Sequence, residues 1–154
     1  MIKEDFTYTD YDGNKREEVC YFNLNAVEVV RLDTQYEDLG GIEGIVKKIS
    51  VKNPPRKLVL EFFETLILTA YGIKSDDGRA LIKRRNGVSL SEEFSQTEAY
   101  NILLTKITSS TEAMANFFNG LVQKSDIDRI KAAKAAKAAE ERDAAKSATL
   151  SVVE

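Results

Sequence analysis

Histidine is absent from the 154-residue chain, and its absence excludes several kinds of chemistry. The imidazole ring is the commonest general base and a frequent metal ligand, and every Ser-His or Cys-His dyad depends on it. The DYDG stretch at residues 10–13 resembles the start of a calcium loop, but Tyr21 stands where the closing glutamate is required. We therefore expect no enzyme, no metal site and no cofactor.

Cysteine occurs once, as Cys20, so the chain cannot form an intrachain disulfide, which suits a reducing compartment. Cys20 lies between Val19 and Tyr21 in a strand-like run, and this context favours a buried structural thiol over a reactive one. Neither an apolar stretch of membrane-spanning length nor a signal-peptide pattern is found. These features predict a cytoplasmic protein without membrane contact.

A strongly basic balance is also missing, since the formal net charge is -3. Duplex-binding domains usually carry a basic face, so this balance argues against nucleic acid. The basic run Lys83–Arg85 has no interleaved aromatic residues and precedes an acidic SEEF segment, so we expect a solvated loop there. The surrounding segment 70–87 lacks the P-loop pattern. We interpret it as a connector between two helices, with Gly72 as a helix cap of positive φ and Asp77-Gly78 as a tight turn.

The first element that the sequence predicts is a β-hairpin over residues 5–23. Phe6 and Tyr8 alternate with polar neighbours, residues 12–14 (DGN) are a strong turn signal, and Val19–Phe22 return as the second strand. An isolated hairpin is marginally stable in water, so we expect this one to pack on helices or to pair with another chain.

Periodic apolar residues then predict a small bundle of about five helices over residues 25–123. Asn25 and Glu28 have the spacing of a capping box before a helix at 26–36, and a short amphipathic helix follows at 41–49. The next helix, expected at 57–71 with Pro55 at its first position, is apolar around nearly its whole circumference and should therefore be central.

Two more amphipathic helices complete the predicted bundle. Each is preceded by a pair of residues with capping-box spacing: Ser95 with Glu98 for the first helix, and Ser109 with Glu112 for the second. We therefore predict a mainly α (α+β) fold, with a globular domain over residues 1–123.

Residues 124–154 differ from the rest in composition. The run KAAKAAKAAEERDAAK has high helix propensity, but alanine is its only apolar residue, so it can bury little surface. The lysines at 131, 134 and 137 form a basic stripe that acidic residues follow closely. We expect an exposed tail that is helical or disordered, or that becomes ordered on a partner.

Large apolar residues exceed what a small core needs, most clearly in the adjacent pairs Phe62-Phe63 and Phe117-Phe118. Adjacent helix residues point about 100° apart, so one member of each pair should be buried. For the second member, a place in the core and a place at the surface are equally expected. Exposed apolar patches often mark binding sites. We predict that six residues contact an amphipathic helix of a partner in a groove: Phe62, Phe63, Met114, Phe117, Phe118 and Leu121.

Five stretches in order connect the chain to a known family: YFNLNAVEV, LGGIEGIVKKI, AYGIKSDDGRALIK, EEFSQTEAYNILLTKI and EAMANFFNGLV. Over about residues 12–122 the chain resembles the tail assembly chaperones of long-tailed, siphovirus-type bacteriophages. The Ala-Tyr-Gly-x-Lys-Ser-x-Asp-Gly-Arg and Phe-x-Gln-Thr-x-Ala-Tyr stretches are the most specific parts of the resemblance.

The resemblance implies a non-catalytic chaperone that binds the helix-rich tape measure protein, keeps it soluble and promotes assembly of the tail tube around it. Such chaperones act in the host cytoplasm and are absent from the finished virion. In many phages a programmed frameshift near the end of the gene makes a longer form, whose extension recruits tail tube subunits. Binding at many sites along one partner would also gain from self-association, through avidity.

Two other functions stay open from the sequence. A structural tail or head-tail connector subunit would be retained in purified virions. A regulator that binds DNA or RNA through Lys83–Arg85 and the tail lysines would show strongly salt-dependent binding.

Overall fold

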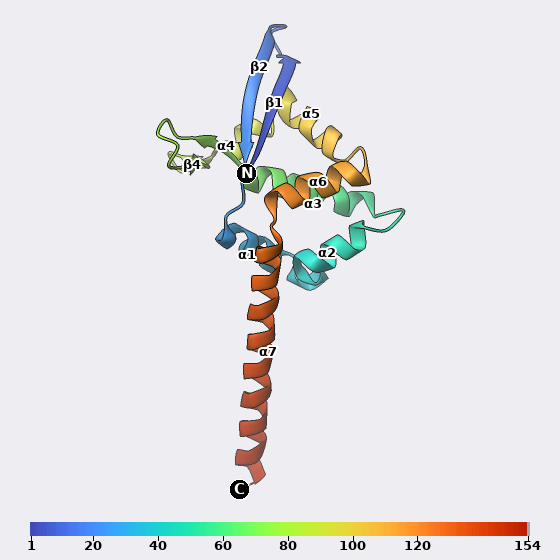
Figure 1. Cartoon of the computed structure of the whole chain (residues 1–154), viewed down its shortest axis with the longest axis vertical. Coiled ribbons are helices and arrows are strands. Elements are labelled where there is room, and N and C mark those ends of the chain that lie inside the picture. Colours follow the sequence, from blue (N-terminus) through green and yellow to red (C-terminus); the bar gives the residue numbers. More distant parts are fainter. Residues whose placement is uncertain (154) are drawn as a thin grey trace. The chain divides into compact units, whose positions relative to one another are not determined.

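The computed structural model describes the backbone of residues 1–153 and the side chains of residues 1–148, so the last residue of the predicted tail lies outside the described part. The chain divides into two compact units, Met1–Val122 and Gln123–Glu154. The first unit combines a small sheet with short helices, and the second is drawn as one long helix (Figure 1). The fold is therefore mainly α with an N-terminal β-hairpin, as the sequence predicts.

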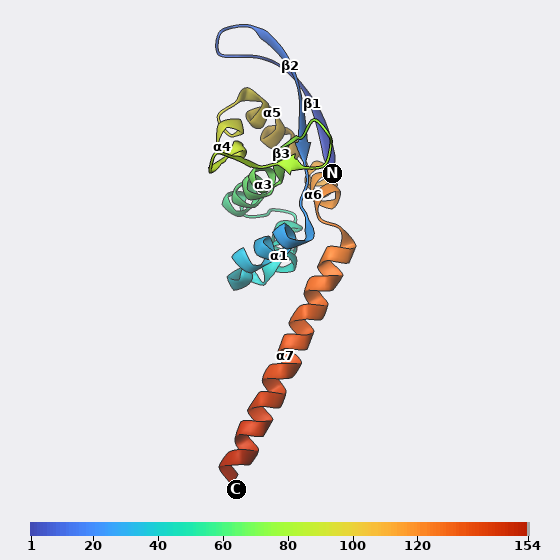
Figure 2. The same cartoon turned by 90° about the vertical axis from the view of Figure 1, so that its left-hand side faces the viewer.

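The hairpin consists of β1 (Ile2–Thr9) and β2 (Lys15–Phe22). The two strands pair antiparallel along their whole length, from Ile2 opposite Phe22 to Thr9 opposite Lys15. In both views the turn end of the hairpin projects beyond the helices, whereas its open end lies among them (Figures 1 and 2).

Asp10 organises the turn of this hairpin. Its carboxylate accepts hydrogen bonds from the backbone N–H groups of Asp12 at 3.0 Å and Asn14 at 2.9 Å. Arg16 Nε donates to the same carboxylate at 2.7 Å, and these donors hold the pKa of Asp10 below its ordinary value. The DYDG stretch is therefore a hydrogen-bonded turn.

Two strands that the sequence reasoning missed extend the sheet. β3 (Tyr71–Lys74) pairs with β2, and β4 (Leu81–Ile82) pairs with β3, so the strand order is β1-β2-β3-β4. The predicted helix cap at Gly72 is wrong: this residue lies within β3, and its φ is not positive. A Cβ at Gly72 would lie 2.6 Å from Leu81 Cγ, so the close packing of β4 selects glycine here.

Segment 70–87 also contains two tight turns. Gly78 has a φ of 72°, which confirms the predicted Asp77-Gly78 turn. β5 (Arg84–Arg85) and β6 (Val88–Ser89) form a second hairpin around two residues with positive φ, Asn86 and Gly87. Such a two-residue turn matches the twist of the strands that it joins.

α1 (Ala26–Gln35) begins at the predicted capping box. The Asn25 side chain accepts the Glu28 N–H at 2.9 Å, and the Glu28 carboxylate accepts the Asn25 N–H at 3.1 Å. Two N–H groups that a helix start leaves unpaired are thus satisfied within four residues.

A 3₁₀ turn (Glu37–Leu39) and α2 (Gly41–Ile49) follow α1. The buried Asp33 carboxylate accepts the backbone N–H of Ile42 at 2.9 Å and thereby joins the end of α1 to the start of α2. This contact spans nine residues and satisfies a donor in the first turn of α2, where helices lack internal partners.

Gly44 lies inside α2, and we expect Gly44→Ala to destabilise the protein although alanine is the better helix former by about 1 kcal/mol. An added Cβ would meet Leu39 O at 1.9 Å, so the backbone must shift, at a cost of about 1–3 kcal/mol. Gly120→Ala is the matched control, because its Cβ meets only the flexible Ile2 side chain. Urea unfolding measures both; a Gly44→Ala protein as stable as the parent would contradict the expectation.

α3 (Arg56–Ala70) runs through the middle of the first unit (Figure 1). It begins at Arg56, one residue before the expected start at 57, and ends at Ala70 because Tyr71 begins β3. Pro55 is the N-cap and not, as the sequence predicts, the first helical residue. Its central position is confirmed by four side chains with no exposed surface: Phe62, Leu66, Ile67 and Ala70.

The segment after the sheet forms α4 (Leu90–Phe94), α5 (Glu98–Ile107) and α6 (Thr111–Leu121). Both predicted capping boxes here are wrong. Ser95 ends α4, and Thr97 caps α5 by accepting the Tyr100 N–H at 3.3 Å. Ser110, one residue after Ser109, caps α6 by accepting the Ala113 N–H at 3.1 Å. Where two hydroxyl residues lie close together, the fold selects which of them caps the helix.

Phe22 forms the centre of the aromatic core where the sheet meets the helices. Its ring lies 5.9 Å from Tyr71, 5.8 Å from Phe94 and 6.0 Å from Phe117. Tyr71 and Phe94 stack with their centroids 4.1 Å apart. These rings join β2, β3, α4 and α6 into one core.

Cys20 is buried beside this core, and burial raises the pKa of its thiol from 9.0 to about 12. The folded thiol stays protonated while the unfolded thiol ionises above pH 9, so this contribution to stability is complete below pH 9 and is lost as the pH rises towards 12. Burial raises the pKa of Tyr71 and Tyr100 to about 12 as well. These two raised pKa values also lower the stability of the folded protein at alkaline pH.

We expect the midpoint of urea unfolding to fall steadily above pH 9, and the native thiol to react with a disulfide reagent only after unfolding. Cys20→Ser removes only the contribution of the thiol, so the urea midpoint of this variant should fall less steeply with rising pH than that of the parent. Rapid labelling of the native protein at pH 8 would contradict the burial of this thiol.

The second unit consists of α7 (Lys124–Val153). All described side chains from residue 131 to residue 148 are exposed. The alanine-rich sequence therefore forms a helix through its intrinsic propensity, without an apolar face to bury.

Candidate functional site

An apolar cavity of about 230 Å³ opens between α2, α3 and α6. Its apolar walls come from all three helices: Val46 and Ile49 of α2, Phe63 of α3, and Met114, Ala115 and Phe118 of α6. Ser50, Thr111 and Asn119 complete its rim. The cavity exists because α2, α3 and α6 turn parts of their apolar faces towards a common space.

Met114 also lines a second cavity, of about 500 Å³. It lies along the first turn of α3, beside Val59, Leu60 and the loop before the helix. Leu60 is 45% exposed, a large value for a leucine in a helix of this unit. The two cavities together form what we call the Met114 groove.

Three of the six predicted contact residues line this groove, namely Phe63, Met114 and Phe118. Met114 and Phe118 are half-buried, whereas Phe63 is 1% exposed and forms the floor. The other three are core residues, with exposed fractions of 0% for Phe62, 5% for Phe117 and 3% for Leu121. Direct contact with a partner is thus possible for Met114 and Phe118 in the described conformation.

The floor of the groove is held by neighbouring aromatic rings. Phe62 lies 6.2 Å from Phe118, 5.5 Å from Phe63 and 5.6 Å from Tyr36, measured between ring centroids. A buried cluster of this kind fixes the orientation of its rings, so the accessible part of Phe118 has a defined position.

The α2 wall of the groove was missed by sequence reasoning. The spacing of Val46 and Ile49 predicts a buried helix face, but periodicity does not distinguish a residue under a neighbour from one at a groove. Only the packing of α2 beside α6 makes that distinction.

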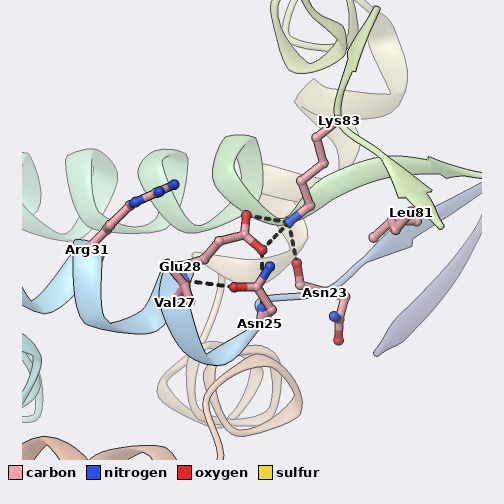
Figure 3. A pocket seen from close by; sticks show the side chains of 7 residues that line it. All are labelled: Asn23, Asn25, Val27, Glu28, Arg31, Leu81 and Lys83. Atoms are coloured by element: carbon pink, nitrogen blue, oxygen red, sulfur yellow. Dashed lines mark hydrogen bonds and ion pairs between the residues drawn. The ribbon is translucent and has the colours of Figure 1, made fainter.

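A polar cavity of about 490 Å³ lies at the start of α1, beside Asn25, Glu28 and Lys83 (Figure 3). Lys83 Nζ donates to both Glu28 carboxylate oxygens at 2.8 and 2.7 Å, to Asn23 O at 2.7 Å and to Thr69 O at 2.9 Å. The expected solvated loop is therefore wrong for Lys83, whose side chain is only 23% exposed. All of its donors are used within the protein, so this ammonium group is not available for a phosphate.

Arg84 and Arg85, the other members of the basic run, are exposed on the β5–β6 hairpin. Arg84 Nη2 donates to Gly87 O at 2.9 Å across the turn. The run thus divides into one residue that holds the fold together and two at the surface.

Among the described residues, no group of three or more His, Cys, Asp or Glu side chains is arranged to hold a metal ion. No helix in the described part of the chain is long and apolar enough to cross a membrane.

The chain matches one family of known proteins. The family model described as phage tail assembly chaperone matches residues 1–154. The chain belongs to the phage tail assembly chaperone family. No curated protein and no solved structure gives a significant match. Tail assembly chaperones are non-structural phage proteins that act in the host cell and interact with tail proteins.

Proposed function

We propose that this tail assembly chaperone binds the tape measure protein non-catalytically and promotes assembly of the tail tube around it. The observation that carries the proposal is the Met114 groove, an apolar surface between three helices. Grooves of this kind accept the apolar face of an amphipathic helix, and a helix-rich tape measure protein offers many such faces.

In this proposal Met114 and Phe118 are the direct contacts on the chaperone. Phe63 forms the floor beneath the partner helix, and Phe62, Phe117 and Leu121 support the groove from the core. Covering the partner's apolar faces would keep it soluble until the tube protein arrives.

The proposal extends to the life cycle of the phage. The chaperone would act in the host cytoplasm and be absent from the finished virion. A frameshifted longer form would recruit tail tube subunits through an extension beyond the Ala- and Lys-rich tail. Self-association would increase its avidity for a long partner.

Co-expression with the tape measure protein of the same phage tests the central claim. Affinity capture followed by size-exclusion chromatography with light scattering should yield a soluble complex with several chaperone copies per partner. If the partner precipitates equally with and without the chaperone, and the chaperone elutes alone, the proposed role is wrong.

Mass spectrometry of purified virions tests the alternative of a structural tail or head-tail connector subunit. We expect no peptides of this chain in the particles. Stoichiometric retention would identify a structural subunit instead. A slippery run in the nucleotide sequence near the stop codon is the expected sign of the longer form.

A further inference from the structure

One margin of the Met114 groove is rich in positive charge. The segment from Lys47 to Lys57, KKISVKNPPRK, contains five cationic residues and no acidic residue, in a chain whose net charge is -3. It covers the end of α2, the connecting loop and the first turn of α3. The loop and this first turn supply Asn53, Pro54 and Arg56 to the groove itself.

The cations of this margin face water. Lys47, Lys52, Arg56 and Lys57 are all exposed. Lys57 has a partner, since its Nζ lies 3.9 Å from a carboxylate oxygen of Glu61 one turn further along α3. A pair of two exposed side chains at this separation contributes little to stability.

Acidic residues near the groove are fewer. Glu43 on α2 and Glu112 on α6 are exposed on the helices that form the walls, and α3 carries the exposed Glu61 and the half-buried Glu64. The five cations of the margin outnumber these four carboxylates, so we expect a positive potential along this side.

We infer that the Met114 groove binds an amphipathic helix whose apolar face is flanked by acidic residues. The apolar face would fill the space beside Met114 and Phe118, and flanking carboxylates would lie along the cationic margin. The inference rests on the proposed function and adds the chemistry of the partner segment. Charge complementarity gives direction and selectivity to binding that the apolar contact alone would not provide.

The charge pattern disfavours the chain's own helix α7 as the occupant. Lysines at 131, 134 and 137 form the first half of its regular repeat and would bring like charge to the cationic margin. Its apolar residues in this repeat are alanines, which fill little of a cavity of this size.

Three synthetic helical peptides test the inference on the full-length chain. Two share one leucine face and carry either glutamate or lysine at the flanking positions; the third contains the glutamate composition in scrambled order. Fluorescence anisotropy at about 0.1 M salt should give at least tenfold tighter binding of the glutamate peptide than of the lysine peptide. Towards about 1 M salt the two affinities should converge.

A matched pair of double variants locates the effect. Lys52→Glu with Arg56→Glu should remove the preference for the glutamate peptide. Arg84→Glu with Arg85→Glu makes the same change of charge on the β5–β6 hairpin and should preserve it. Glutamate at position 56 lies in the first turn of α3, where the helix dipole favours an anion, so this variant should stay folded. Circular dichroism checks the fold of both.

Equal affinity for the glutamate and lysine peptides would overturn the inference, as would a preference that only the Arg84 and Arg85 variant removes. A dimer in light scattering that Phe118→Asp dissociates would assign the groove to a second copy and would also overturn it. Capture of the tape measure protein without any peptide preference would leave the proposed function standing and refute the acidic flank. Tight, selective binding of the glutamate peptide without capture of the tape measure protein would support the acidic-helix site and refute the proposed function.

Discussion

Phe118→Asp is expected to weaken capture of the tape measure protein by about 100-fold, because aromatic residues at the centre of a groove dominate binding energy. Phe118 lines the groove and is half-buried, so its ring is accessible to a partner while resting on Phe62. Aspartate at this position would remove the apolar contact and place a charge without a partner in the interface. Affinity capture with quantified partner recovery measures the loss.

The control for this experiment is Asn116→Asp, an exposed position on the same helix outside the groove. It introduces the same residue into α6 and should leave capture unchanged. Circular dichroism and thermal unfolding establish that both variants are folded. Full capture by a folded Phe118→Asp protein would show that the groove is not the contact surface.

Lys83→Met is expected to destabilise the protein by about 2–3 kcal/mol, a large effect for a residue in a nominally basic loop. Methionine keeps much of the side-chain volume but removes the ammonium group that donates to the Glu28 carboxylate and to two backbone carbonyls, Asn23 O and Thr69 O. Among the described residues, the Glu28 carboxylate keeps only the Asn25 N–H of the capping box as a donor. Glu28 is only 14% exposed, so water compensates its charge incompletely. Urea unfolding with a fixed m-value measures the change.

Arg84→Met, the adjacent exposed position, is the matched control and should change stability by less than about 0.5 kcal/mol. Glu28→Gln separates the charge from the cap, since glutamine also completes a capping box. The double variant with Lys83→Met should be less destabilised than the sum of the two single variants, because the same pair is broken only once. Additive effects would show that Lys83 and Glu28 act independently.

The sequence predicted correctly those elements that depend on patterns among residues close together in the chain. The hairpin follows from a turn sequence between two alternating runs, and the Asn25 capping box follows from two residues three positions apart. The all-round apolar character of residues 57–71 similarly predicts a central helix, and α3 is that helix. Each of these patterns acts over a few residues, so the rest of the fold hardly alters it.

Strands β3 and β4 illustrate the opposite case. β3 is four residues long and β4 is two, so neither shows an alternation that can be recognised. They exist because β2 supplies a hydrogen-bonding edge: Tyr21 pairs with Gly72, far away in the chain. Tertiary pairing of this kind overrides a weak local preference.

For the candidate site, the sequence by itself determined which apolar residues the chain would have available and that histidine chemistry was excluded. It also determined the mainly helical architecture, because periodicity and caps are local properties. Only the tertiary structure decided which apolar residues reach the surface: Phe62 and Phe117 lie in the core, whereas Met114 and Phe118 line a groove. It also decided that the Lys83 ammonium group donates hydrogen bonds to Glu28 and to two backbone carbonyls and is not a solvated basic group. The physical reason is that exposure and ion pairing depend on which distant elements pack together, and here Glu28 and Lys83 are 55 positions apart in the chain.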